Sequence, residues 1–384
     1  MSPTAENLLQ ALTKLAPEIA ESAQDIERNR AVPEQVIARL ADTGVFRLAA
    51  PRTVGGLQAD PMTMLAACEL LGRADGSTGW TAMIGAATSV VFGYLDPAVA
   101  TGMLADPGCL IAGVAAPSGR ATPVPGGFRV RGQWAFASAS QQATWLVGGC
   151  LVVEGDAVVL GPTGAPQVLL AIMPRSEVTV QDTWDAVGLC GTGSHDMFAD
   201  AVFVPTERTF SLAVPPATPH GAFPVLSLLA MGIGAVALGI VQAAIDEFTR
   251  LAEVKLHPLT RQPLAAKPAA QAVLAEATAL RAAGRAFLLD EVSRCWAQAC
   301  AAQAVALADR ARLRLAITNA TTMAADAVGR LYRAAGGTAA YRSSPLQRHF
   351  RDVNVAAQHA LVNADTLELV GAVLLGQDVS TLRL

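Results

Sequence analysis

The amino-acid sequence predicts an α+β fold in which a helical unit, a small antiparallel β domain and a four-helix bundle follow one another. Apolar residues recur every three or four positions over residues 1–108, which indicates helices. Short Val- and Phe-rich runs alternate with Gly and Pro turns over residues 109–215, which is typical of antiparallel strands. Helical spacing returns in residues 216–384. Strands and helices are segregated along the chain, so a βαβ sheet is excluded.

The N-terminal unit shows a helix start at Pro33 and a further helix from Met62 to Leu71. The polar stretch GRADGSTG then leads into a second apolar helix, whose first turn carries Trp80. A tryptophan at such a position more often belongs to the core than to a binding site. Trp80 alone therefore indicates no function.

The β domain is expected to use the segments LIAGVAAP, GGFRVRGQWAFAS, TWLVGGCLVV, QVLLAIMP, VTVQDTW and FADAVFVP as strands. The last of these follows the glycine-rich stretch GLCGTGSHD, which contains His195. Ser194 and Asp196 have side chains suited to capping such a turn. His195 is a secondary candidate for lining a substrate pocket.

The C-terminal unit is expected to form long helices near residues 225–255, 266–301, 303–334 and 352–375. No charged residue occurs from Gly221 to Ile245, a length that is sufficient to span a bilayer. Pro224 near its start and several small residues favour a helix buried within the bundle. The GIGAVALG stretch departs from GxGxxG and follows no strand, so a dinucleotide loop is excluded.

Composition narrows the class of protein. The 384 residues carry a net charge of −4, which argues against a nucleic-acid partner. Six cysteines without a CxxC pair indicate reduced thiols, and neither a zinc site nor a disulfide framework is expected. No basic stretch followed by an apolar one begins the chain, so we expect a cytoplasmic protein without a membrane anchor.

The five histidines are the main candidates for acid–base chemistry. Two of them, His220 and His257, lie in polar loops and are expected to face water, and His349 lies among arginines and is expected to be structural. His359 instead belongs to an apolar helical stretch, where it is either a core histidine or an imidazole delivered to an apolar site. It follows a loop of glycines and arginines that begins at Gly336 and is suited to binding an anion.

No GxSxG, HExxH or P-loop motif occurs, so hydrolase, zinc and NTPase chemistry lack support. The stretches RLAAPRTVGG, GSTGW, RGQWAFAS, VGLCGTGSHDMFADAVFVP, RQPLAAKPAAQ and YRSSPLQRHFRDV occur in an informative order. Together they resemble the acyl-CoA dehydrogenase superfamily, and more closely its flavin-dependent monooxygenase branch, the oxygenase components of two-component aromatic hydroxylases. The resemblance covers nearly the whole chain and implies the acyl-CoA dehydrogenase-like fold and a homotetramer.

Dehydrogenases of this superfamily use a glutamate to remove an α-proton from an acyl thioester. The position that matches this glutamate is Ala360, and no Asp or Glu occurs from Arg208 through Ile245, where other members place the base. Loss of the carboxylate removes the group that abstracts the proton. Acyl-CoA dehydrogenation is therefore disfavoured.

The monooxygenase branch implies a set of site residues. Its histidine falls on His359 and its flavin-contacting serine on Ser138, and the glycine that usually follows this serine is Ala139 here. The implied cofactor-binding residues are Trp80 beside the flavin, Phe136 and Ser138 near N5, Arg261 at a phosphate in a neighbouring subunit, and Gly336, Gly337 and Arg351 in a loop that encloses the cofactor across a dimer contact.

The resemblance implies hydroxylation of an aromatic or polycyclic small molecule through a flavin C4a-hydroperoxide. By the same resemblance, the cofactor would be FMNH2 or FADH2 delivered by a separate NAD(P)H-dependent reductase, and O2 would be the oxidant. Ser138 would hold N5, Phe136 would help to exclude water, and His359 would deprotonate a phenol. The alternatives are an acyl-CoA dehydrogenase or oxidase with an atypical base, an N- or S-oxygenase, and a flavin fold that only binds.

Overall fold

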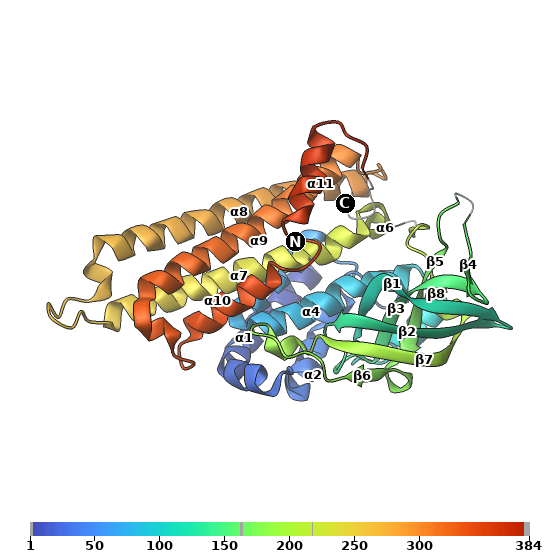
Figure 1. Cartoon of the computed structure of the whole chain (residues 1–384), viewed down its shortest axis with the longest axis horizontal. Helices are drawn as coiled ribbons and strands as arrows, with labels where there is room; N and C mark the ends of the chain where they lie inside the picture. The colour runs from blue at the N-terminus through green and yellow to red at the C-terminus, as the bar shows by residue number, and fades with distance from the viewer. Residues whose placement is uncertain (1–2, 162–163, 217, 380–384) are drawn as a thin grey trace.

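The structure is a computed structural model that describes residues 3–161, 164–216 and 218–379. N-terminal helices, a sheet and long C-terminal helices follow one another along the chain, with the sheet at one end of the molecule and the connections 255–267 and 336–344 of the long helices at the other (Figure 1). The chain passes from helix to strand between Leu104 and Ile111 and back to helix between Phe210 and Pro219. The predicted α+β class is confirmed.

The N-terminal helices are α1 (Pro3–Asn29), α2 (Glu34–Thr43), α3 (Pro61–Ala74), α4 (Gly76–Thr88) and α5 (Pro97–Leu104). Helix α4 begins earlier than the sequence suggested, because the Asp75 carboxylate caps it by accepting the Thr78 N–H at 2.7 Å. The polar GSTG stretch is therefore helical. Trp80 consequently lies in the second turn of α4, which is buried almost throughout.

The sheet contains β1 (Ile111–Val124), β2 (Gly127–Ala137), β3 (Trp145–Glu154), β4 (Ala157–Val158), β5 (Val168–Pro174), β6 (Thr179–Gln181), β7 (His195–Pro205) and β8 (Thr209–Phe210), in the order β6-β7-β2-β1-β3-β5-β8 with β4 beside β3. The prediction of a purely antiparallel domain is wrong for one pair, because β1 and β3 are parallel. The β1–β2 hairpin reverses the chain once. Strand β3 reverses it again and pairs with the other edge of β1, so both strands run the same way.

The C-terminal helices are α6 (Pro219–Ala222), α7 (Val225–Val254), α8 (Pro268–Cys300), α9 (Leu307–Ala335), α10 (Pro345–Ala356) and α11 (Asp365–Leu374). Helix α7 packs against α3 and α4 on one side and against α8, α9 and α10 on the other. Within the described residues it is the one helix long and apolar enough to cross a membrane, and 78% of its most apolar stretch is buried. It is the core helix of the bundle.

The contact between α3 and α7 depends on glycines. A Cβ at Gly239 would lie 2.3 Å from the Glu69 carbonyl oxygen, and one at Gly72 would lie 2.7 Å from the Val236 carbonyl oxygen. Such distances are far inside van der Waals contact, so only glycine lets the two backbones approach this closely. This contact joins the N-terminal helices to the bundle.

The predicted helix over 352–375 is broken. Helix α10 ends at Ala356, α11 begins at Asp365, and His359 lies in the turn between them. The His359 Nδ1 atom accepts the Leu361 N–H at 3.2 Å, and this local bond competes with helical hydrogen bonding. The segment is thus largely helical, as predicted, but the prediction of one continuous helix is wrong.

Candidate active site

Three segments that are distant in sequence meet at the Ser138 hydroxyl. The indole N–H of Trp80 on α4 donates to Ser138 Oγ at 3.0 Å, just beyond the end of β2. Ser138 Oγ also lies 2.7 Å from Ser194 Oγ, which is contributed by the loop before β7. All three side chains are buried. The structure thus brings together two residues that the sequence proposed, Trp80 and Ser138.

Unusual backbone angles flank Ser138. Phe136 and Ala139 both have φ +62°, in the left-handed region that favours glycine. The Ala139 N–H donates to the Thr192 carbonyl at 2.9 Å, which fixes the turn against the neighbouring loop. Alanine holds this conformation at a cost of about 1–2 kcal/mol. Such strain is concentrated at functional sites.

His359 lies against Trp80, with ring centroids 5.8 Å apart in an edge-to-face arrangement. Burial, together with the positive charge of Arg314, lowers the pKa of His359 to about 4, so the ring is neutral at pH 7. Because Nδ1 accepts the Leu361 N–H, the ring proton resides on Nε2. The neutral imidazole therefore offers an N–H donor, and this geometry disfavours the expected role as a base toward a phenol.

Phe136 does not shield Ser138 within one chain. Its side chain is 71% exposed and meets Trp184 edge-to-face, with centroids 6.3 Å apart. Phe136 can therefore exclude water from the site, as expected, only when a cofactor or a second protein chain covers its side chain.

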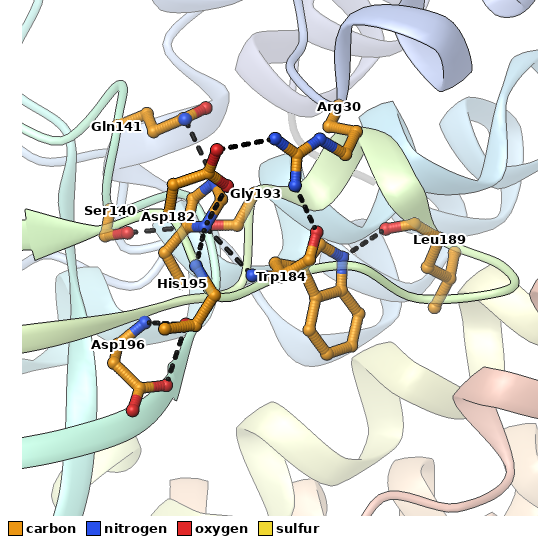
Figure 2. A network of polar contacts seen from close by, with 10 residues as sticks. Arg30, Ser140, Gln141, Asp182, Trp184, Leu189, Gly193, His195 and Asp196 are labelled. Atoms are coloured by element: carbon orange, nitrogen blue, oxygen red, sulfur yellow. Dashed lines mark hydrogen bonds and ion pairs between the residues drawn. The ribbon is translucent and has the colours of Figure 1, made fainter.

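His195 is a structural residue rather than a lining of a pocket (Figure 2). It is 1% exposed, and its Nδ1 accepts the N–H groups of Thr183 and Trp184, each at 3.1 Å. On the other side of the ring, His195 Nε2 lies 3.0 Å from the side-chain Nε2 of Gln141. Burial lowers the pKa of His195. The ring holds the 182–189 loop in place.

The same loop is fixed at two further points (Figure 2). Arg30, at the end of α1, donates to the Asp182 carboxylate at 2.7 Å and to the Trp184 carbonyl at 3.0 Å. The Trp184 indole N–H donates to the Leu189 carbonyl at 3.1 Å. Leu189 itself has φ +49°. These hydrogen bonds hold the loop that leads to Ser194.

The sequence also proposed a cofactor-enclosing loop with Gly336, Gly337 and Arg351, and these residues lie after α9 and on α10. The Arg351 guanidinium binds the Glu27 carboxylate at 2.5 Å and the Val187 carbonyl. Gly336 (φ +63°) and Gly337 begin the short helix η8 (Gly336–Ala340), directly after α9. Within one chain the guanidinium thus holds α10 against α1 instead of facing an open anion site.

Arg261 is exposed in the connection between α7 and α8. This connection lies at the end of the bundle remote from the sheet (Figure 1). Arg261 therefore does not join Trp80 and Ser138 within one chain. Its expected phosphate contact requires a neighbouring subunit.

Among the remaining histidines, the expectation that His220 faces water is wrong. Its side chain is buried, Nε2 lies 2.8 Å from the Ala59 carbonyl oxygen, and the ring centroid is 4.9 Å from that of Trp296. His257 is partly exposed. His349 is buried, and burial together with Arg348 lowers its pKa to about 3, as suits a structural residue.

Sequence reasoning missed Thr192 and Asp352. The Thr192 hydroxyl lies 2.7 Å from Ser194 Oγ, and Asp352 Oδ1 accepts the Leu189 N–H at 2.6 Å. Burial, and after it the nearby Asp75, raise the pKa of Asp352 to about 7. Both residues lie in stretches that carry the family resemblance, GTGS and RDV, and the resemblance was the signal that could have found them.

Comparison with known proteins agrees with this geometry. The acyl-CoA dehydrogenase N-terminal domain matches residues 2–97 and the acyl-CoA dehydrogenase C-terminal domain matches residues 231–364. Indole-3-acetate monooxygenase of Pseudomonas putida is 32% identical over 92% of this chain and 90% of its own. The oxygenase subunit HsaA of a flavin-dependent monooxygenase from Mycobacterium tuberculosis is 30% identical over 93% of this chain and 92% of its own.

Solved structures give the same result. The HsaA monooxygenase from M. tuberculosis superimposes with a TM-score of 0.89 at 28% identity, over 99% of this chain and 100% of that chain. XiaF from Streptomyces sp., solved in complex with FADH2 and glycerol, superimposes with a TM-score of 0.88 at 25% identity, over 97% of this chain and 96% of that chain.

The fold and the Ser138 site define a flavin enzyme built on the acyl-CoA dehydrogenase architecture. Within that superfamily the chain belongs to the flavin-dependent monooxygenases, which are oxidoreductases that use reduced flavin. The resemblance seen in the sequence is confirmed.

Proposed function

We propose that this chain is the oxygenase component of a two-component system that hydroxylates an aromatic small molecule with reduced flavin and O2. One observation carries the proposal: a neutral His359 lies against the Trp80 that donates to Ser138. The adjacent residue is Ala360, where a dehydrogenase would need a carboxylate. The site thus offers hydrogen bonds in an apolar setting and no base for an acyl thioester.

The Ser138 hydroxyl fits a reduced flavin. Its oxygen accepts the Trp80 N–H and contacts Ser194, which leaves one further hydrogen-bonding position. A reduced flavin carries a hydrogen on N5, and Ser138 would hold it. When bound, the reduced flavin would supply the two electrons that activate O2, and one oxygen atom of O2 would be transferred to the substrate while the other leaves as water. Trp80 would pack beside the ring system.

A homotetramer would complete the cofactor site. Arg261 is exposed at the end of the bundle remote from Ser138, so a neighbouring copy of the chain would bring it to a cofactor phosphate. The highly exposed Phe136 is suited to being covered by cofactor or by such a neighbour. These two exposures support the tetramer.

The substrate is an aromatic or polycyclic molecule with a polar substituent. Relatives are named for indole-3-acetate and, in Rhizobium sp. at 31% identity, for FADH2-dependent resorcinol hydroxylation. His359 would donate its Nε2 hydrogen to an oxygen of the substrate and so orient the ring. This role replaces proton abstraction.

A separate NAD(P)H-dependent reductase would supply the reduced flavin, either FMNH2 or FADH2. Relatives are named as an oxygenase subunit and an oxygenase component, which supports a partner of this kind. All six cysteines are unpaired, which is in keeping with a reducing cytoplasm.

The test is oxygen incorporation. Purified chain, loaded anaerobically with reduced FAD or FMN, is mixed with ¹⁸O₂ and with indole-3-acetate or resorcinol, and the product is analysed by mass spectrometry. We expect one ¹⁸O atom in a hydroxylated product. Acyl-CoA substrates with an electron acceptor serve as the control, and robust acceptor reduction without any reductase would contradict the proposal.

A further inference from the structure

Five polar groups form a continuous hydrogen-bonded chain that passes through the Ser138 hydroxyl. Trp80 Nε1 lies 3.0 Å from Ser138 Oγ, and Ser138 Oγ lies 2.7 Å from Ser194 Oγ. The chain continues for 2.7 Å to Thr192 Oγ1 and for 2.8 Å to the Leu189 carbonyl oxygen. The side chains come from α4, the end of β2 and the loop that begins at η5 (Cys190–Thr192).

The two ends of this chain fix the direction of every hydrogen bond. A carbonyl oxygen only accepts, and two oxygens 2.8 Å apart repel unless a hydrogen lies between them, so Thr192 donates to Leu189. A hydroxyl carries one hydrogen. Ser194 must therefore donate to Thr192, and Ser138 must donate to Ser194. The indole N–H at the other end only donates.

The end at Leu189 is held firmly. Its carbonyl also accepts from the Trp184 indole at 3.1 Å, and its N–H donates to Asp352 Oδ1 at 2.6 Å. Thr192 and Ser194 are 1% and 5% exposed, so bulk water does not compete for their hydrogens. The direction of the chain is therefore a property of the folded protein.

Ser138 is consequently left with a single free lone pair and no free hydrogen. Reduced flavin has a hydrogen on N5, whereas oxidised flavin has a lone pair there. We propose that Thr192 and Ser194 are positioning residues that hold Ser138 as an acceptor and so make the site selective for reduced over oxidised flavin. The inference rests on the proposed function, in which Ser138 meets N5.

The test compares the dissociation constants of reduced flavin, titrated anaerobically, and of oxidised flavin. Thr192→Val removes the hydroxyl at nearly constant volume, and Thr192→Ser keeps it. Because Ser138 then regains a hydrogen for oxidised flavin, we expect the ratio of oxidised to reduced dissociation constants to fall about five- to tenfold in Thr192→Val. A tenfold fall lowers the midpoint potential of the bound flavin by about 30 mV.

Thr192→Ser should retain the wild-type ratio. Ser140→Ala should retain it too, because the Ser140 hydroxyl donates to the Gly193 carbonyl and takes no part in the hydrogen-bonded chain. Ser194→Ala interrupts the chain at its middle and provides a second variant if Thr192→Val does not fold. A wild-type ratio in either folded variant, or equal binding of both flavin forms by the wild type, overturns the inference alone. A wild-type protein that binds neither form overturns the proposed function itself.

Discussion

Ala139 shows how a single residue adapts to the site. It holds a left-handed backbone with φ +62° while its methyl group is fully buried. In a change from alanine to glycine, relief of the backbone strain would raise the free energy of unfolding, and loss of the buried methyl group would lower it. Ala137, two residues earlier in β2, is equally buried without a positive φ.

We expect Ala139→Gly to change the free energy of unfolding by less than about 1 kcal/mol, because relief of left-handed strain offsets the greater freedom of glycine in the unfolded chain. Ala137→Gly, the matched control, should destabilise by about 1–2 kcal/mol. Urea unfolding measures both. Equal losses in the two variants would show that Ala139 is unstrained.

His359 is expected to act as a hydrogen-bond donor. With its pKa lowered to about 4, the ring stays neutral across the physiological range. His359→Gln keeps an N–H donor, and His359→Ala removes it, which should slow hydroxylation roughly tenfold further. The ratio of wild-type to His359→Gln rates should be constant from about pH 5.5 to 8, because the ring does not titrate in this range. A ratio that changes with pH around about 6.5, the ordinary pKa of histidine, would instead support His359 as a catalytic base.

At the level of elements, α10 carries a buried carboxylate, Asp352, to the loop that ends the hydroxyl chain. Its pKa is raised to about 7 by burial and by Asp75, the residue that caps α4, while the Leu189 N–H and the charges of Arg348 and Arg351 partly oppose this rise. The folded protein therefore retains a proton on Asp352 at pH values where the unfolded chain has lost it. Between about pH 4 and 7 this group makes stability fall as pH rises.

Asp352→Asn is expected to remove that component while keeping an oxygen that accepts the Leu189 N–H. The stability of the variant relative to the wild type should be greater at pH 8 than at pH 5, by on the order of 1–3 kcal/mol. Urea unfolding at the two pH values measures the difference. The exposed Asp42 on α2 gives the control, Asp42→Asn, which should show no such difference. An equal effect of Asp352→Asn at both pH values would contradict the assignment.

Periodicity predicted the order of the elements well, because burial of an apolar face fixes that spacing. It misplaced the start of α4 and the break after Ala356, since each depends on one side chain, Asp75 or His359, that binds local backbone. The parallel pairing of β1 with β3 is a long-range choice without a local signal. Family resemblance located Trp80 and Ser138, but the hydroxyl chain depends on loop conformations that no propensity predicts.

At the scale of the whole molecule, an ion pair joins the last turn of α1 to α10. Arg351 on α10 binds Glu27 on α1, 324 residues earlier, and each side chain is about one quarter exposed. This contact holds the C-terminal helices to the N-terminal ones beside the 182–189 loop. It also gives Arg351 a role that differs from the cofactor contact expected from the sequence.

A double-mutant cycle with Glu27→Gln and Arg351→Gln separates the two roles. We expect a coupling of about 1 kcal/mol in the free energy of unfolding, a modest value because water screens the pair. The affinity for reduced flavin should stay within about threefold of the wild type in both single variants, a change of less than 1 kcal/mol. A tenfold loss of affinity in Arg351→Gln alone would return Arg351 to the cofactor site.

The turn between α10 and α11 has a consequence for how substrate range diverges. In a helix, one inserted residue would rotate every later side chain by about 100° and disturb the packing of the bundle. In a turn, an insertion or deletion moves the side chains near it and leaves the flanking helices in register. Because His359 lies in this turn, a change in turn length would move the imidazole, and with it the substrate contact proposed for His359, while the flanking helices keep their packing.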